Sequence, residues 1–312
     1  MTVSAPAFDV PASRDDVVFD IDHVTLRFGG ITSLNDVSLQ MYRGEILAVI
    51  GPNGAGKTSL FNSLTGLYHP QEGSITVAAR PGDSLVSVLG KKTHVINQLG
   101  VARTFQNIRL FPALTALENV QVGIETRQRS GAISAMFKMP WQQREQRESL
   151  ASAIEQLADV KLGHRANELA GSLPYGEQRR LEIARALGTN PGVLLLDEPA
   201  AGTNPAEKRE IAQLIQRINT ERGITVLLIE HDMKLVMSTA HRIIVLNFGE
   251  KIAEGSPQAI QRDPIVIAAY LGTSAEDAVE QVENQPQIQL IDTGEDATEA
   301  EPDGAGHSGD QP

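Results

Sequence analysis

A run of glycines around one lysine is the strongest chemical signal in the sequence. Gly51-Pro52-Asn53-Gly54-Ala55-Gly56-Lys57-Thr58, followed by Ser59, has the spacing of a phosphate-binding loop. Glycines let backbone N–H groups turn toward phosphate oxygens, and the N-terminus of a following helix adds positive potential. Lys57 would reach the β- and γ-phosphates, and the Thr58 hydroxyl would bind Mg²⁺. The sequence therefore predicts a nucleotide site that residues 51–59 line.

A pair of carboxylates supplies the second half of this predicted site. Asp197 and Glu198 directly follow the apolar run Val193–Leu196. Charges at the carboxyl end of a buried strand are costly unless they serve a metal ion or a reacting water. We expect Asp197 in the Mg²⁺ shell and Glu198 as the general base that orients the attacking water. An ordinary polar strand exit is the alternative, but together with the loop the pair predicts nucleotide hydrolysis.

These groups need a sheet and helices to position them. Two segments alternate apolar and polar residues, as half-buried strands do, namely Val18–Phe28 and Val37–Met41. Three continuous apolar runs are typical of parallel strands buried on both faces, namely Ile46–Ile50, Val193–Leu196 and Ile224–Ile229. The polar helical stretch Ala206–Glu221 separates the last two, and Ile243–Leu246 with Lys251–Ala253 predicts a closing hairpin. The expected fold class is α/β, with a mostly parallel core sheet and an antiparallel β subdomain.

The remaining segments define the expected domain organisation. Residues 1–16 lack periodicity and predict a flexible arm. Residues from about 80 to 170, rich in Gln, Arg, Glu and Ala, predict a helical subdomain inserted in a domain that spans 17–272. Residues 273–312 contain 11 acidic side chains and no Lys or Arg, and predict a disordered acidic tail. Within the tail, Gln287–Ile291 is an alternative docking motif.

Charge and composition exclude several classes of protein. The net charge is −12, but without the tail the chain is nearly neutral, which argues against a strongly basic nucleic-acid surface. The chain has no cysteine, which excludes disulfides and thiolate metal sites. Its apolar runs fall far short of the roughly 20 residues of a membrane helix, and its start lacks the pattern of a secretory signal. We therefore expect the protein in the cytoplasm.

Three further motifs identify a family. Leu173-Pro174-Tyr175-Gly176-Glu177-Gln178-Arg179-Arg180 precedes Asp197 at the position of the signature of ABC-transporter ATPases. Gln106 in Thr104-Phe105-Gln106-Asn107 matches the Q-loop of that family, and His231 in Ile229-Glu230-His231-Asp232 matches its switch histidine. The resemblance covers roughly residues 17–272 with five motifs in the expected order. It implies a P-loop NTPase of the ABC ATPase type.

The resemblance also implies roles for single residues. Phe28 would stack on adenine, Gln106 would be a Mg²⁺ ligand that senses the membrane partner, and His231 would contact the γ-phosphate and position the water. Taken alone, Phe28 is equally typical of a core aromatic, and a lone His or Gln is usually a surface or satisfied polar residue.

The family signature acts across a dimer. Leu173, Pro174, Tyr175, Gly176 and Glu177 would cap the nucleotide of a second subunit, so that two ATPase subunits close head to tail around two ATP molecules. Pro174 departs from the usual serine and has no hydroxyl for the opposite γ-phosphate, so we expect a weakened site in the partner subunit. Ala201-Gly202-Thr203-Asn204 also departs from the family, since many relatives end this loop in aspartate.

Three segments resemble one subfamily, the LivG-type ATPases of branched-chain amino acid importers. These segments are residues 103–111, 198–205 and 269–272. The implied partners are a second ABC ATPase, two membrane permeases whose cytoplasmic helices meet the helical insert and the surface beside Gln106, and an external substrate-binding protein. The implied location is the cytoplasmic face of the cell membrane, and no nucleic acid is expected. Alternatives are other cargoes (urea, other amino acids, lipopolysaccharide export) or a soluble ABC ATPase without a transport role. The cationic segment Arg127–Arg147, with Trp141, predicts a solvated helix face, with permease or lipid contact as the alternative.

Overall fold

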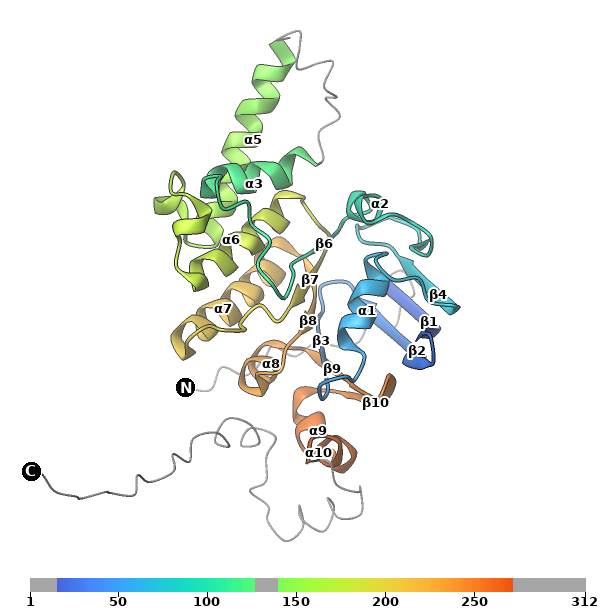
Figure 1. The fold of residues 1–312 in the computed structure, drawn as a ribbon. Coiled ribbons are helices and arrows are strands. Elements are labelled where there is room, and N and C mark those ends of the chain that lie inside the picture. The colour runs from blue at the N-terminus through green and yellow to red at the C-terminus, as the bar shows by residue number, and fades with distance from the viewer. Residues whose placement is uncertain (1–15, 127–139, 272–312) are drawn as a thin grey trace, which may run out of the picture.

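A six-stranded sheet forms the centre of the protein (Figure 1). The computed structural model describes residues 16–126 and 140–271. The expected N-terminal arm up to residue 15, the acidic tail with Gln287–Ile291, residues 127–139 of the cationic segment and the side chain of Trp141 therefore lie outside the described residues. The strand order is β10-β9-β3-β8-β7-β6, and the pairs from β9 to β6 are all parallel. The strands are β3 (Ile46–Ile50), β6 (Val101–Arg103), β7 (Val193–Asp197), β8 (Thr225–Ile229), β9 (Arg242–Asn247) and β10 (Glu250–Gly255).

A second, antiparallel sheet has the order β2-β1-β4-β5. Its strands are β1 (Val17–Phe28), β2 (Ile31–Tyr42), β4 (Glu72–Val77) and β5 (Val86–Ser87). The two sheets confirm the expected fold class, with apolar runs in the parallel core and alternating segments in the antiparallel subdomain. The expected hairpin is also confirmed, since β9 and β10 pair antiparallel across Phe248 and Gly249.

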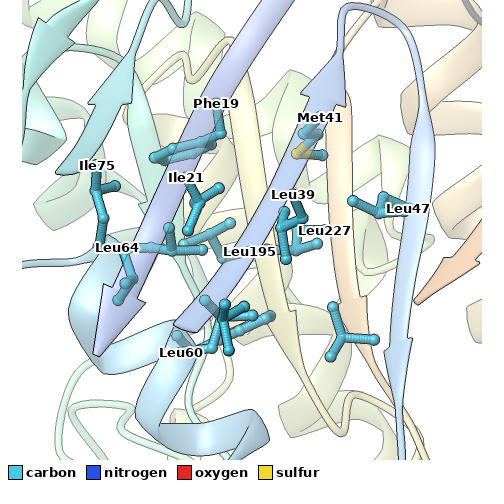
Figure 2. Close-up of a cluster of buried hydrophobic side chains, with 14 of the residues drawn as sticks. Phe19, Ile21, Leu39, Met41, Leu47, Leu60, Leu64, Ile75, Leu195 and Leu227 are labelled. Atoms are coloured by element: carbon cyan, nitrogen blue, oxygen red, sulfur yellow. The ribbon is translucent and has the colours of Figure 1, made fainter. Parts of the chain in front are cut away.

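Strand alternation divides the core sheet into two faces. Leu195 and Leu227 lie in one hydrophobic cluster with α1 (Lys57–Leu64) and the antiparallel sheet (Figure 2). Their neighbours Leu196 and Leu228 lie in another cluster, on the opposite face, because successive side chains of a strand point to opposite sides. The sheet therefore separates α1 from the helices on its other side.

Helices cover that second face. They are α6 (Tyr175–Gly188) and α7 (Pro205–Arg222). Two more helices, α3 (Ala116–Glu125) and α5 (Pro140–Asp159), pack on α6 and on each other, with single 3-10 turns at Gly163–Arg165 and Ala170–Ser172. Local sequence sets the limits of α7, because Asn204 and Glu207 form a capping box, Pro205 starts the helix and Gly223 (φ 65°) ends it. A third cluster packs α8 (Met233–Thr239), α9 (Pro257–Gln261) and α10 (Pro264–Leu271) against β3 and β9.

The segment that we expect to be mostly helical, residues 80–170, begins differently. It contains β5, α2 (Thr93–Gln98) and β6 before the first long helix, α3. β6 joins the core sheet through parallel pairing with β7, from Val101↔Val193 to Arg103↔Leu195. Three residues are too few to show a β pattern in the sequence, and the pairing that makes them a strand is non-local. Over residues 80–103 the mostly helical expectation is therefore wrong, while the limits of the domains stay predictions.

A buried ion pair joins the two sheets. The Glu45 carboxylate accepts from Arg242 Nε at 2.7 Å and Arg242 Nη2 at 3.0 Å, and it also accepts from the backbone N–H of Tyr42 at 2.9 Å. Glu45 is fully buried, and Arg242 is nearly so. Bidentate geometry and extra hydrogen bonds are what a buried pair needs to offset the cost of desolvation.

We predict that Glu45→Ala lowers the free energy of unfolding by about 2 kcal/mol, because it removes one of the two carboxylates that pair with the buried Arg242 guanidinium, the other being that of Glu254. Urea unfolding followed by circular dichroism measures the change. The exposed residue Glu221 provides the control, and Glu221→Ala should change stability by less than about 0.5 kcal/mol. A loss equal to that of the control would contradict a stabilising role for the pair.

Candidate nucleotide site

The phosphate-binding loop connects β3 to α1 and is held between two other strands. Gly51, Gly54 and Gly56 have φ of 148°, 81° and 101°, a region that side chains disfavour. A Cβ on Gly51 would lie 2.0 Å from the carbonyl oxygen of Leu246, and one on Gly56 would lie 2.6 Å from that of Ser33. The glycines at these two positions therefore fit where no side chain would.

Lys57 begins α1 and folds back over the loop. Its Nζ donates to the carbonyl oxygens of Gly51 at 2.6 Å and Pro52 at 2.9 Å. Burial lowers the pKa of Lys57, and the nearby charges of Glu198 and Asp197 oppose that shift. A cation held by backbone oxygens beside a helix N-terminus is suited to bind an anionic ligand.

The neighbouring hydroxyls differ in their surroundings. Thr58 is exposed in the first turn of α1, whereas Ser59 Oγ lies 2.7 Å from Ser33 Oγ of β2. Asn53 and Gly54 are exposed at the tip of the loop, and Ala55 is buried beneath it. Of the loop residues, Thr58 is the hydroxyl that faces solvent, so it is open to a ligand.

Asp197 ends β7 on the face that α1 covers. Val193 and Leu195 pack in the α1 cluster, so alternation directs Asp197 to the same side. Its Oδ2 accepts from Arg103 Nη2 at 2.8 Å in a buried ion pair. Burial raises the pKa of Asp197, and the hydrogen bond and charge of Arg103 oppose that shift.

The residues on this side of the sheet fit Mg²⁺ bound together with a nucleotide. Within residues 16–126 and 140–271 no group of three or more His, Cys, Asp or Glu side chains is placed to hold a metal ion. Mg²⁺ does not require such a group, because in nucleotide sites it is bound by one or two protein oxygens, phosphates and water. The Thr58 hydroxyl and the Asp197 carboxylate are ligands of that kind.

Three predicted residues from successive strand ends meet beside Asp197. Gln106 follows β6, Glu198 follows β7 and His231 follows β8. Glu198 Oε2 accepts from Gln106 Nε2 at 3.0 Å and lies 4.0 Å from His231 Nδ1. The His231 side chain is 64% exposed, and that of Glu198 is 21% exposed. The structure thus joins the expected base to the Q-loop and switch residues, while a place for Gln106 in the metal shell stays a prediction.

Phe28 lies at the end of β1 and is 45% exposed, so it is not a core aromatic. Its ring meets Tyr68 edge to face, with centroids 4.9 Å apart. An exposed ring fixed by a neighbour is suited to stacking, but adenine stacking stays a prediction.

The signature residues surround the start of α6. Leu173 is buried, Pro174 is the N-cap residue without a side-chain cap, and Tyr175 is exposed. A Cβ on Gly176 would lie 2.6 Å from Glu207 Oε1, and Glu177 forms an ion pair with Arg165 at 3.3 Å. Because α6 and α1 cover opposite faces of the core sheet, the structure does not bring the signature and the phosphate loop of one chain together.

The sequence analysis assigned no role to three charged residues that hold the site together. Arg103 pairs with Asp197, and Arg179 donates to the carbonyl oxygens of Phe105 at 2.9 Å and Gln106 at 2.5 Å. Glu230 accepts from the backbone N–H of Ala200 at 2.9 Å. A signal for Glu230 was present, because it follows the apolar run 224–229 as Asp197 follows 193–196. Nothing local identified the two arginines.

A cavity of about 770 Å³ lies beside the Q-loop segment. It is lined by polar, cationic and apolar side chains from the end of α1, from α2, β6 and the Q-loop segment, and from the end of α3, namely Thr65, Leu67, Lys92, Thr93, His94, Ile96, Asn97, Gln98, Val101, Arg103, Phe105, Arg109 and Thr126. Arg103 therefore contributes both to this cavity and to the ion pair with Asp197.

In the described part of the chain, none of the helices has the length and apolar character needed to cross a membrane.

Two families of known sequences match the chain. The family described as "ABC transporter" matches residues 34–201, and the one described as "Branched-chain amino acid ATP-binding cassette transporter" matches residues 250–276. The chain is 45% identical to the high-affinity branched-chain amino acid transport ATP-binding protein BraF of Pseudomonas aeruginosa, over 82% of this chain and 98% of BraF. It is 44% identical to LivG of Escherichia coli, which has the same description, over 82% of this chain and 98% of LivG.

Solved structures agree with these similarities. The ADP conformation of MJ1267, an ATP-binding cassette of an ABC transporter, matches with a TM-score of 0.70 at 30% identity, over 82% of this chain and 99% of that one. The dimeric structure of MJ0796, a bacterial ABC transporter cassette, matches with a TM-score of 0.64 at 28% identity, over 77% and 98% of the two chains.

We predict that Gly51→Ala destabilises the protein by at least about 2 kcal/mol and abolishes nucleotide binding, because the new Cβ would overlap the Leu246 carbonyl. Urea unfolding and titration with a fluorescent nucleotide measure the two effects. Gly30→Ala is the matched control, since a Cβ there meets nothing within 4 Å. Wild-type binding by Gly51→Ala would show that the loop has room that the structure does not show.

Proposed function

The chain belongs to the ABC transporter family, and from that premise we propose that it is the ATP-hydrolysing subunit of an importer for branched-chain amino acids. The observation that supports branched-chain amino acids as the cargo is the 44–45% identity to BraF and LivG over 98% of their lengths. The match of residues 250–276 to the branched-chain amino acid family supports it. The cargo is proposed from these relatives, since this subunit is not expected to contact it.

In this proposal the phosphate loop binds the nucleotide, and residues at the strand ends hold the metal ion and activate the water. The Lys57 ammonium group and the backbone N–H groups of residues 51–59 other than Pro52 bind the phosphates, and Phe28 stacks on adenine. Thr58 and Asp197, with Gln106, would hold Mg²⁺, which supplies charge neutralisation at the β- and γ-phosphates. Glu198 accepts a proton from the attacking water, and His231, 4.0 Å from Glu198, orients the water and contacts the γ-phosphate.

A second ABC ATPase subunit completes the site. The dimeric MJ0796 structure supports pairing of cassettes. The placement of α1 and α6 on opposite faces of the core sheet supports a signature that acts on the partner's nucleotide. Pro174 supplies neither a hydroxyl nor a backbone N–H, so the partner's γ-phosphate would bind the N–H groups at the start of α6 instead.

The cavity beside the Q-loop supports contact with a membrane permease. Its Leu67, Ile96 and Phe105 are apolar and its Lys92 and Arg109 are cationic, which suits an amphipathic helix with acidic residues. Two permeases at such cavities would hold the ATPase pair at the cytoplasmic face of the membrane. An external substrate-binding protein would deliver the amino acid to the permeases.

We predict that Glu198→Gln reduces ATP turnover at least about 100-fold, because the general base is lost, while ATP still binds and closes the dimer. Phosphate release measures turnover, and equilibrium binding of labelled ATP measures affinity. Glu221→Gln, on an exposed position, should keep the wild-type rate. Normal phosphate release by Glu198→Gln would remove Glu198 from its assigned role.

We also predict that cells whose only copy of this protein carries Glu198→Gln lose uptake of labelled leucine but keep uptake of labelled urea. The reason is that transport of the proposed cargo depends on hydrolysis at this residue. Unchanged leucine uptake beside an active wild-type control would contradict the cargo and leave the ATPase chemistry standing. Loss of urea uptake would indicate that urea is the cargo instead.

A further inference from the structure

Glu230 has a buried carboxylate close to Glu198 and His231, and the mechanism above gives it no role. Glu230 follows β8 and is 1% exposed. Its Oε1 accepts from the backbone N–H of Ala200 at 2.9 Å, and its Oε2 accepts from the backbone N–H of His231 at 3.2 Å. Burial raises the pKa of Glu230, and the hydrogen bonds from the two backbone N–H groups oppose that shift.

The segment that Glu230 holds on one side carries the expected general base. Glu198 has φ of 48°, a left-handed conformation that a residue with a Cβ adopts at an energetic cost. Such a conformation persists only where its surroundings fix it. Two bonds from the end of β8 do so, one from Glu198 N–H to the Ile229 carbonyl oxygen at 2.9 Å and one from Ala200 N–H to Glu230.

On its other side Glu230 faces the switch histidine. Its Oε2 lies 4.0 Å from His231 Nδ1, the same separation as between His231 Nδ1 and Glu198 Oε2. The two oxygens of one side chain are thus bonded to the two backbone segments that present Glu198 and His231. Alternation along β8 supports this placement, because Leu228 packs on the same face as Ala200, and Glu230 follows two residues later.

We propose that Glu230 is a positioning residue for hydrolysis. It fixes the Glu198 segment against the His231 segment, so that the Glu198 carboxylate and the His231 ring contact the same attacking water. The inference rests on the proposed function, since it takes Glu198 and His231 as the groups that handle the water. Because Glu230 is 1% exposed, we expect it to act through these two segments and not by contact with the nucleotide. Displacement of a catalytic group by about 1 Å costs about 100-fold in rate, so loss of this bond should lower turnover and leave ATP affinity intact.

The test uses the intact transporter, purified through a tag on this chain. Glu230→Leu removes both acceptors at similar volume, and Glu230→Gln keeps one acceptor. We expect kcat to fall about 10- to 100-fold for Glu230→Leu and less for Glu230→Gln, with the KM for ATP within about twofold. Ile218→Ala, a buried change at the far end of α7, controls for lost stability alone.

Amide hydrogen exchange of the nucleotide-free protein provides a readout besides activity. Peptides that contain Ala200 should exchange faster in Glu230→Leu than in wild type or Ile218→Ala, because the N–H loses its acceptor. Unchanged exchange at Ala200, wild-type kcat, or a loss of kcat no larger than that of Ile218→Ala would each overturn the inference. A wild-type transporter that binds ATP without hydrolysing it would contradict the proposed function instead, and the exchange result would still decide whether Glu230 holds the segment.

Discussion

The site depends on one constraint, the parallel alignment of neighbouring strands whose carboxyl ends meet at one edge of the core sheet. β3 ends in the phosphate loop, β6 leads to Gln106, β7 ends in Asp197 and Glu198, and β8 leads to Glu230 and His231. Parallel pairing fixes these ends relative to each other, for example Asp197 opposite Ile229. Residues far apart in the chain therefore meet without any long loop, as in other open α/β sheets.

Three charged side chains at that edge of the sheet have hydrogen-bond partners that offset the cost of their burial. Asp197 pairs with Arg103, Glu230 accepts backbone N–H groups, and Lys57 donates to loop carbonyls. Each interaction offsets a desolvation cost that the packed sheet imposes. The same requirement links the site to its surroundings, because Arg103 also donates to Asn62 of α1 at 2.6 Å and lines the cavity beside the Q-loop.

The sequence predicted those parts of the fold that local pattern determines. Ile46–Ile50 appears as β3 and Val193–Leu196 as β7, because continuous apolar runs are specific for strands buried on both faces. β6 was missed because three residues become a strand only through pairing with β7. Among site residues, the glycine loop and the Asp197–Glu198 pair carry their chemistry in their spacing. The partners Arg103 and Arg179 do not, since they act through contacts with residues more than 70 positions away.

Arg179 connects the start of α6 to the segment that follows β6. It lies in α6, five residues after Pro174, and donates to the carbonyl oxygens of Phe105 and Gln106 and to the Tyr175 hydroxyl. Gln106 in turn donates to Glu198. The start of α6, the Q-loop segment and the expected base are thus joined by consecutive hydrogen bonds within one chain. A shift of the Q-loop segment at the cavity would therefore act on both Glu198 and the start of α6, which is the physical connection that the proposed coupling of ATPase and permease requires.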